Sequence, residues 1–167
     1  MDRSIFSHND FCVKHMLVSI FVLLTPFFAQ VLLSQPVDRE LLTREWPAKW
    51  ICMPGSPAGD HGVSLFRKAF DLKAKPDCFI IHVSADNRYK LYVNEQLVSM
   101  GPARGDMYYW NYETVDIAPF LYAGTNIVAA RVWNEGAFRP EAQISWHTGF
   151  ILQGNSASES VVNKNNS

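Results

Sequence analysis

The chain has 167 residues, a formal net charge of −1 and 48% hydrophobic residues. This length predicts one domain that is large enough to bury a real core, to which five tryptophans contribute. The balanced charge argues against nucleic acid as a partner, because binding phosphates needs a basic surface. It also gives no electrostatic reason for binding an anionic membrane.

The first 34 residues differ from the rest of the chain. An almost entirely apolar run, Met16 to Phe28, follows a polar stretch. This order is typical of a secretory signal peptide, a hydrophobic helix cleaved here after Ser34. The alternative is an uncleaved membrane anchor over residues 16–33, although polar residues interrupt it and a spanning helix needs about 20 mainly apolar residues. The chain is thus expected to be secreted or periplasmic, or else membrane-anchored.

The spacing of the cysteine and histidine residues predicts neither a disulfide nor a zinc site. Cys12 lies in the predicted signal, which leaves Cys52 and Cys78. Export permits a disulfide between them, but no motif spacing predicts one, so a bridge and two buried thiols both remain open and the thiols are favoured. The histidines are scattered singly, and no Cys/His spacing indicates zinc. We expect no metal and no cofactor.

Short strands dominate the chain after a polar lead-in at residues 35–45. Glycine and proline make residues 54–60 a loop, and β-branched or alternating runs follow it. In residues 63–72 both faces carry apolar groups, which predicts a position near the middle of a sandwich. Strands are predicted, in chain order, at residues 63–72, 79–83, 89–93, 96–98, 114–116 and 126–133, with a last strand within 141–153 that places Trp146, Thr148, Phe150 and Leu152 on one face.

The turns between these strands also leave signatures. Asn94-Glu95 predicts a hairpin whose turn is strained or lengthened, because the usual glycine is replaced by Glu95. Asp116 is predicted to cap one helical turn at residues 117–121. Without any alternation of strands and helices, the fold class is all-β, an antiparallel β-sandwich over residues 46–153. Residues 154–167 predict a polar tail that buries too little apolar area to become ordered.

A series of short motifs makes the sequence more specific than a generic β-sandwich. In chain order they are Trp50-Ile51, Phe66-Arg67-Lys68, Ser84 to Asn94, Gly101 to Asp106, Tyr112 to Asp116 and Val132-Trp133-Asn134. Over residues 46–163 this series resembles the N-terminal β-domain of bacterial α-L-rhamnosidases, glycoside hydrolase family 78. The chain is more distantly similar to the jelly-roll, galactose-binding-like domains of β-galactosidase-type enzymes.

The resemblance implies that catalysis lies elsewhere. Such rhamnosidases invert configuration with two carboxylates set about 6.5–9.5 Å apart, and these lie in a large (α/α) barrel further along the chain. No position here matches them, so the resemblance assigns no catalytic residue. Family members also continue beyond residues 161–163 into another tryptophan-bearing strand. The resemblance therefore predicts a domain truncated before the catalytic barrel, and a sandwich without its last strand.

Polar and aromatic residues at strand ends are the candidate contacts to a sugar or to a neighbouring domain. Arg104 and Asp106 can hold vicinal hydroxyls, but a loop-bracing ion pair is favoured. Tyr108, Tyr109, Trp110 and Tyr112 form an aromatic patch. This patch fits an interface with another domain better than core packing or sugar contact. Asp86, Asn87 and Arg88 follow the second predicted strand, and we favour a role in which their side chains brace the turn there. The full set is Asp86, Asn87, Arg88, Arg104, Asp106, Tyr108, Tyr109, Trp110 and Tyr112.

The functional expectation is a noncatalytic accessory domain of an α-L-rhamnosidase, the enzyme class that hydrolyses terminal α-L-rhamnosyl residues of glycans. Its partner would be the rhamnosidase catalytic domain, with rhamnose-containing glycans as further candidates. One alternative is a stand-alone carbohydrate-binding module. Another is a fragment that complements a separately encoded catalytic part. Catalysis by this chain alone is not expected, because its carboxylates and histidines form no recognisable motif.

Overall fold

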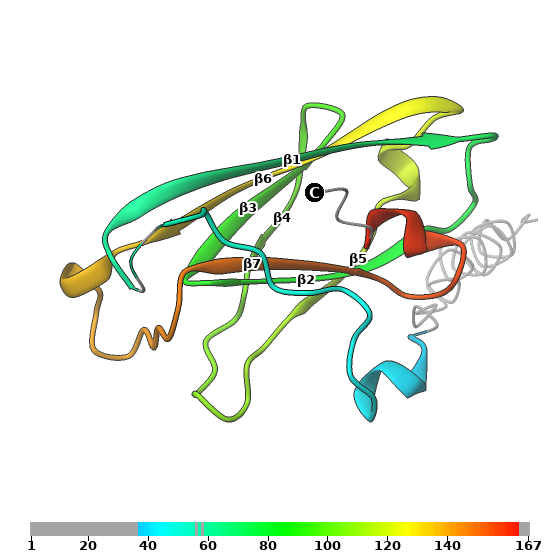
Figure 1. Cartoon of the computed structure of the whole chain (residues 1–167). Helices are drawn as coiled ribbons and strands as arrows, with labels where there is room; N and C mark the ends of the chain where they lie inside the picture. Colours follow the sequence, from blue (N-terminus) through cyan, green and yellow to red (C-terminus); the bar gives the residue numbers. More distant parts are fainter. Residues whose placement is uncertain (1–36, 56, 58, 164–167) are drawn as a thin grey trace, which may run out of the picture. The chain divides into compact units, whose positions relative to one another are not determined.

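The structure, a computed structural model, describes residues 37–55, 57 and 59–163 (Figure 1). The predicted signal peptide or anchor lies outside these residues, as does the end of the polar tail. In the described part of the chain, no helix is long and apolar enough to span a membrane.

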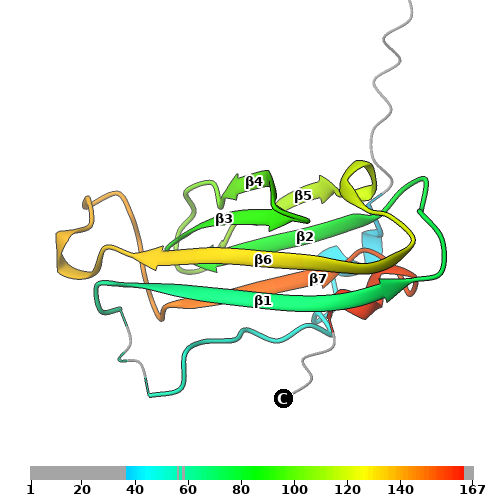
Figure 2. The same cartoon turned by 90° about the horizontal axis from the view of Figure 1, so that it is seen from above.

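Two antiparallel sheets pack face to face as a β-sandwich (Figures 1 and 2). The remaining elements are short 3-10 turns at η1 (Arg39–Leu42), η2 (Ala118–Phe120), η3 (Gly136–Phe138) and η4 (Glu159–Val162). The prediction of an all-β, antiparallel sandwich is confirmed. One sheet has the order β1 (Gly62–Leu72), β6 (Gly124–Asn134), β3 (Arg88–Val93) and β4 (Gln96–Gly101); the other has the order β5 (Glu113–Asp116), β2 (Ile80–Asp86) and β7 (Gly149–Gly154).

The core lies between the inner faces of the two sheets. Alternate residues of β2 and β3 point into it, as the pleat of a strand requires. The rings of Phe66 and Phe150 stack across it with centroids 5.4 Å apart. Burial of these side chains supplies most of the driving force for folding. Fully buried core residues include Ile81, Val83, Ala85, Tyr89, Leu91, Val93, Ile117 and Val132.

Strand β1 lies at a sheet edge, so the prediction that it lies near the middle is wrong. It pairs with β6 alone, from Gly62–Asn134 to Leu72–Gly124. Its outer face leaves Val63 and Leu65 exposed, at 63% and 73%. Apolar residues on both faces suggested burial, but only the face that carries Phe70 is covered by the second sheet.

The hairpin between β3 and β4 is strained as expected. Asn94 and Glu95 both have left-handed backbones, with φ of 47° and 71°, which Glu95 adopts at a steric cost. The Asn94 side chain fixes the turn because its Nδ2 donates to the Phe120 carbonyl at 2.8 Å and its Oδ1 accepts from Ile127 N at 2.9 Å.

The predicted helical turn after β5 is present as η2. The N-cap of this turn is Ile117 and not Asp116 as predicted, but the Asp116 carboxylate accepts from the backbone N–H of Ala118 at 3.0 Å and so still supports the turn. The same Oδ1 also accepts from Phe79 N at 3.0 Å, which ties this turn to the start of β2.

The last strand is shorter than predicted. β7 begins at Gly149, so Trp146 and Thr148 lie in the preceding loop and share no strand face with Phe150. The reason is a competing acceptor: the backbone N–H groups of Trp146 and His147 donate to the Asp86 carboxylate rather than to a neighbouring strand.

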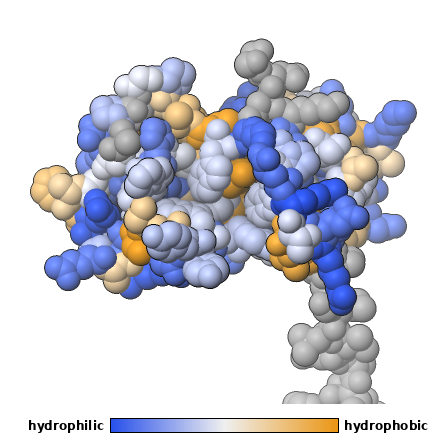
Figure 3. Space-filling model, turned by 60° about the horizontal axis from the view of Figure 1, so that its bottom comes forward, coloured by the Kyte–Doolittle hydropathy of each residue, from blue (hydrophilic) through white to orange (hydrophobic). Residues whose placement is uncertain are grey.

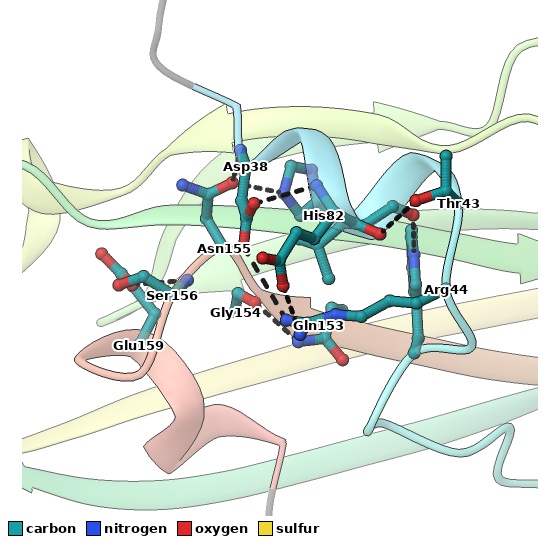
Figure 4. Close-up of polar contacts among 12 residues, drawn as sticks. Asp38, Thr43, Arg44, His82, Gln153, Gly154, Asn155, Ser156 and Glu159 are labelled. Carbon is teal, nitrogen blue, oxygen red and sulfur yellow. Dashed lines mark hydrogen bonds and ion pairs between the residues drawn. The ribbon is translucent and has the colours of Figure 1, made fainter.

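Residues 155–163 pack on the sandwich, against the prediction for this part of the tail. η4 buries Val162 in the core and buries Glu159, whose carboxylate accepts from Ser156 N at 2.9 Å (Figure 4). Asn163 Oδ1 also accepts from Gly154 N at 2.6 Å. Specific side-chain bonds fix this segment, and its polar composition gave no sign of them.

The lead-in packs on the sheet as well, through backbone and ring contacts. Leu41 of η1 is buried, and Trp46 Nε1 donates to its carbonyl at 2.9 Å. Asp38 N donates to Asn155 Oδ1 at 2.8 Å (Figure 4), and Ala48 N donates to Gln153 Oε1 at 2.9 Å.

Cys52 and Cys78 are free and exposed thiols. The favoured expectation of two thiols is correct in that no bridge joins them, but the prediction that they are buried is wrong. Partial desolvation and nearby Asp116 and Glu159 raise the pKa of the Cys78 thiol, which lowers its reactivity.

Candidate functional site

The outer face of β2 organises the predicted site. Ile81, Val83 and Ala85 point into the core, so His82, Ser84 and Asp86 point outward. All three outward side chains are nevertheless buried, because the lead-in and two loops cover this face. The covering differs along the strand: it is closed at His82 and hollow at Asp86.

The His82 end is closed by rings and hydrogen bonds. His82 Nδ1 lies 2.9 Å from Thr114 Oγ1, and its Nε2 lies 3.1 Å from Asn155 Oδ1 (Figure 4). Trp46 and Tyr112 flank the imidazole, with ring centroids 5.8 and 5.5 Å away. Burial lowers the pKa of His82, although the bond to Asn155 partly opposes this. Both ring nitrogens are engaged, so His82 is a structural residue.

The Asp86 end is held by a carboxylate that bonds to backbone. Asp86 is 3% exposed, and its Oδ2 accepts from Trp146 N at 2.6 Å and His147 N at 2.7 Å. Its Oδ1 lies 3.5 Å from Asn134 Nδ2, a marginal contact. Asp86 therefore fixes the loop before β7 and keeps acceptor capacity on one oxygen.

The next two predicted residues face other loops. Asn87 is fully buried, and its Nδ2 contacts the Ile144 carbonyl at 3.5 Å. Its Oδ1 has no partner among the described residues and borders a cavity of about 10 Å³, close to the space of one water molecule. Arg88 donates to the Pro102 carbonyl, which anchors the start of the loop after β4.

The loop between β4 and β5 is braced differently from the prediction. In the described part of the chain, no ion pair joins Arg104 and Asp106. Asp106 Oδ1 instead accepts from the backbone N–H groups of Tyr108 and Tyr109, both at 2.8 Å. Asn111 Nδ2 donates to the Arg104 carbonyl at 2.7 Å. A carboxylate two residues before free N–H groups forms such a turn without a cation.

The predicted aromatic patch divides into two pairs. Tyr108 and Tyr109 project from the loop, at 92% and 77% exposure. Trp110 turns inward, and its Nε1 lies 3.4 Å from the Ala85 carbonyl. Tyr112 packs edge to face on Trp46 with centroids 5.0 Å apart. The loop thus presents two tyrosines outward and uses the other two rings to cover β2.

A pocket of about 630 Å³ opens at the Asp86 end of β2. Three segments far apart in sequence form it: the segment before β1, the β4–β5 loop, and the loop before β7. The first and third are joined by Ile51 and Phe150, which exchange two backbone hydrogen bonds of 2.9 Å. Its principal walls are Trp50, Asp86, Met107, Trp110, Trp146 and His147.

Trp50 and Trp110 form one corner of this pocket. Their rings are nearly perpendicular, at 86°, with centroids 6.4 Å apart. Gly149 permits this packing, because a Cβ there would lie 3.2 Å from the Trp50 ring. Trp146 also lines the pocket, and its side chain is 72% exposed to solvent. Figure 3 shows one side of the molecule, where small orange apolar areas alternate with pale and blue residues rather than merging into one apolar face.

Four of these walls were not predicted from the sequence, namely Trp50, Met107, Trp146 and His147. Trp146 was expected on a strand face and Trp50 at the start of the domain, 96 positions apart in the numbering. No sequence pattern links them, because their meeting depends on the Ile51–Phe150 bridge. The described residues also bring no three His, Cys, Asp or Glu side chains together as a metal site.

The chain matches no protein-family model and no curated protein. Among solved structures, a GH78 family rhamnosidase of Bacillus sp. GL1 is 27% identical, with a TM-score of 0.62. The match covers 68% of this chain and 12% of that enzyme. The sandwich is structurally similar to part of a family 78 α-L-rhamnosidase. The chain spans only a small part of the length of the enzyme that it matches.

Two further α-L-rhamnosidases match at lower similarity. The Streptomyces avermitilis enzyme, solved with L-rhamnose, is 21% identical with a TM-score of 0.48, over 68% of this chain and 11% of its own. The Dictyoglumus thermophilum enzyme is 19% identical with a TM-score of 0.49, over 69% of this chain and 15% of its own.

Proposed function

We propose that this chain is a noncatalytic accessory domain of an α-L-rhamnosidase, a jelly-roll sandwich that packs on the catalytic domain. The observation that carries the proposal is the match to the Bacillus rhamnosidase, which covers 68% of this chain and only 12% of the enzyme. The enzyme's hydrolysis of α-L-rhamnosides belongs on this view to the other parts of the protein.

The chemistry of the β2 face supports a noncatalytic role. An inverting glycosidase needs one carboxyl group to protonate the leaving group and a second to activate water, about 6.5–9.5 Å away. Asp86 and Asp106 instead accept backbone N–H groups at 2.6–2.8 Å. His82 is enclosed between rings and spends both nitrogens on Thr114 and Asn155. These groups hold loops in place.

The two projecting tyrosines are the proposed contact with the catalytic domain. Tyr108 and Tyr109 expose most of their rings on a loop whose backbone is fixed by Asp106. A rigid, exposed aromatic pair suits an interface core, where tyrosine is enriched, and ordering it on binding costs little entropy.

Association with a family 78 catalytic domain tests this proposal. We expect the chain to bind a catalytic domain that lacks its own equivalent sandwich, measured by analytical ultracentrifugation, and not to hydrolyse an aryl α-L-rhamnoside by itself. Replacing both tyrosines with alanine should weaken binding at least tenfold. The control is Phe138→Ala, an equally exposed ring at 85% on another loop. Turnover by the chain alone, or equal binding by both variants, would refute the proposal.

Export remains part of the proposal as well. The apolar run Met16 to Phe28 supports a signal peptide, with a membrane anchor over residues 16–33 as the rival. Expression with the native N-terminus and mass spectrometry of the soluble product would show a new terminus near Gln35. Retention of the whole N-terminus in the membrane fraction would instead support the anchor.

A further inference from the structure

Strand β1 leaves one edge of its sheet without a partner strand. It is the outermost strand of that sheet (Figure 2) and pairs, among the described strands, with β6 alone. It runs for 11 residues, from Gly62 to Leu72, without a proline and without a break in its register. Native proteins usually shorten, bend or block such an edge, because it offers backbone donors and acceptors to any extended chain.

The hydrogen bonds of β6 show which backbone groups of β1 face this edge. Asn94 N donates to the Ile127 carbonyl at 2.9 Å, so the odd-numbered residues of β6 direct their backbone groups toward β3. The even-numbered residues of β6 therefore bond to β1, where they lie opposite its even-numbered residues. The backbone N–H and C=O groups of Arg67, Ala69 and Asp71 consequently point away from the sheet.

The space beside these groups is open. A groove of about 500 Å³ lies between β1 and β7, and Arg67 and Ala69 line it although their side chains lie on the outer face of the sheet. An inward-pointing lysine such as Lys68 is one device that blocks a sheet edge. Its Nζ instead donates to the Val162 carbonyl at 3.1 Å. The edge can therefore accept another strand.

The outer side chains of this part of β1 are self-complementary. Arg67 and Asp71 are exposed and form no ion pair with a described residue. Asp71 Oδ1 accepts from Thr125 Oγ1 at 2.6 Å, and a carboxylate has acceptor capacity on its second oxygen as well. Since the small Ala69 lies midway between the two charges, an antiparallel copy of β1 centred on Ala69 places each Arg67 opposite an Asp71.

We infer that two copies of this chain associate through β1, antiparallel about a two-fold axis at Ala69. In this register Arg67 exchanges backbone hydrogen bonds with Asp71 of the second copy, and the two Ala69 residues exchange theirs with each other. An axis at Arg67, Lys68 or Asp71 would instead place that charged residue opposite itself, which destabilises a strand pair. Two-fold pairing also covers the edge of both copies, so the assembly closes as a dimer.

Sedimentation equilibrium of the full chain tests the association. We expect a reversible dimer, weak because one strand edge buries little surface. Ala69→Pro removes the N–H that points to the second copy and keeps the bonds to β6, so it should weaken the dimer at least tenfold with an unchanged circular dichroism spectrum. A parent chain that stays monomeric up to about 1 mM, or a folded Ala69→Pro chain that dimerises as the parent does, would overturn the proposal.

Exchange of charges tests the register without changing the backbone. Arg67→Asp and Asp71→Arg each place like charges opposite one another, so each should weaken the dimer at least threefold, and the double variant should regain most of the parent affinity. The control is Lys90→Asp, which reverses a cation on the outer face of the same sheet but on β3, and it should leave the affinity unchanged. A double variant weaker than either single variant, or an equal loss with Lys90→Asp, would refute this register.

Cross-linking locates the two-fold axis. In a chain whose three cysteines are replaced by serine, Ala69→Cys places two thiols opposite each other with Cα atoms about 5.5 Å apart, within the range of a disulfide. Mild oxidation should then give a covalent dimer on a non-reducing gel. Leu65→Cys is the matched control on the same edge, opposite Lys73 of the second copy, and should cross-link much more slowly. Equal cross-linking of the two variants would refute an axis at Ala69.

The dimer does not depend on the accessory role, because Tyr108 and Tyr109 lie on the β4–β5 loop and not on β1. Replacing both tyrosines with alanine should leave the dimer unchanged, and Ala69→Pro should leave catalytic-domain binding unchanged. The two proposals therefore fail separately. Loss of the dimer in the tyrosine variant would overturn its assignment to β1.

Discussion

His82 and Asp86 lie four residues apart on the same outward face of β2, yet their surroundings differ completely. Around His82, two aromatic rings and two side-chain hydrogen bonds fill the space. Around Asp86, the same kind of covering leaves a pocket of about 630 Å³ with three exposed or half-buried indoles. The comparison teaches that one strand face serves stability at one end and is available for binding at the other.

The physical basis of the difference is what each polar side chain bonds. His82 bonds to side chains, which fill the space around the ring, while Asp86 bonds to backbone N–H groups of a loop whose Trp146 and His147 side chains line the pocket. Packed rings fill the space at the His82 end. At the Asp86 end, the loop backbone is fixed by its hydrogen bonds to the carboxylate and leaves the pocket open. Four substitutions test this contrast, from the largest expected effect to the smallest.

Closing the His82 end depends on Gly154. A Cβ at this position would lie 2.5 Å from the Glu159 carbonyl oxygen, which is backbone and cannot turn away. We therefore expect Gly154→Ala to lower the free energy of unfolding by about 3 kcal/mol, as overpacking does, in urea titrations. Gly62→Ala is the control, since no atom lies within 4 Å of its Cβ and its φ is not left-handed. Similar stabilities for both variants would contradict the tight packing of η4.

Opening of the Asp86 end depends on its carboxylate. Asp86→Asn keeps the shape and one acceptor oxygen but removes the charge, so the bonds from the Trp146 and His147 N–H groups weaken and the new amide nitrogen faces the Asn134 Nδ2 donor. The expected loss is about 2 kcal/mol of unfolding free energy, the usual cost for hydrogen bonds to a charged group. Asp106→Asn, on an exposed loop, is the control and should cost clearly less. A larger effect at Asp106 would reverse the assignment.

Low pH should lower the stability of the fold through His82. Burial lowers the pKa of His82, so below about pH 6.5, its ordinary value, the unfolded chain takes up a proton that the folded chain refuses. Unfolding free energy is then fully present above this pH and falls as the pH drops toward the lowered folded pKa. Urea midpoints from pH 8 to 5 measure this, and His82→Gln should flatten the profile between about pH 6.5 and 5. An identical pH profile for the variant would exclude His82 as the cause.

The projecting tyrosines should matter least for stability. Tyr108 and Tyr109 are almost fully exposed, so replacing both with alanine should change the free energy of unfolding by less than about 0.5 kcal/mol. A loss of 2 kcal/mol or more, on the scale of about a buried side chain, would show that these rings belong to the covering of β2 and not to a free surface. Thermal unfolding followed by circular dichroism measures this.

Much of the fold was readable from local sequence, and the site only in part. Alternation and turn residues predicted the strands, the strained Asn94–Glu95 turn and the helical turn after Asp116, because these features depend on nearby residues. Which strand lies beside another is not a local property, so residues 63–72 were predicted near the middle of the sandwich, whereas β1 lies at a sheet edge. The start of β7 was missed because Asp86 accepts from a backbone N–H 61 residues away. The packing of residues 155–163 was missed although its bonds are closer in sequence, because the polar composition alone gave no sign that Glu159 and Asn163 would accept from Ser156 N and Gly154 N.

Among the candidate site residues, the sequence drew attention to Asp86 and Trp110, which line the pocket, and to Tyr108 and Tyr109, which are exposed on the loop between β4 and β5. It also suggested an Arg104–Asp106 ion pair, where the structure has a turn closed by backbone N–H groups. Complementary charges close in sequence predict a contact, but a nearer backbone donor competes for the same oxygen.

The sequence by itself determined that the chain forms an antiparallel β-sandwich, because strand periodicity and turn chemistry are local properties. It also carried the resemblance to family 78 rhamnosidases, through short motifs kept in order. Only the tertiary structure decided that Trp50, Trp110 and Trp146 share one pocket. Their meeting rests on the Ile51–Phe150 bridge and on Asp86, contacts between residues far apart in the chain that no sequence period encodes.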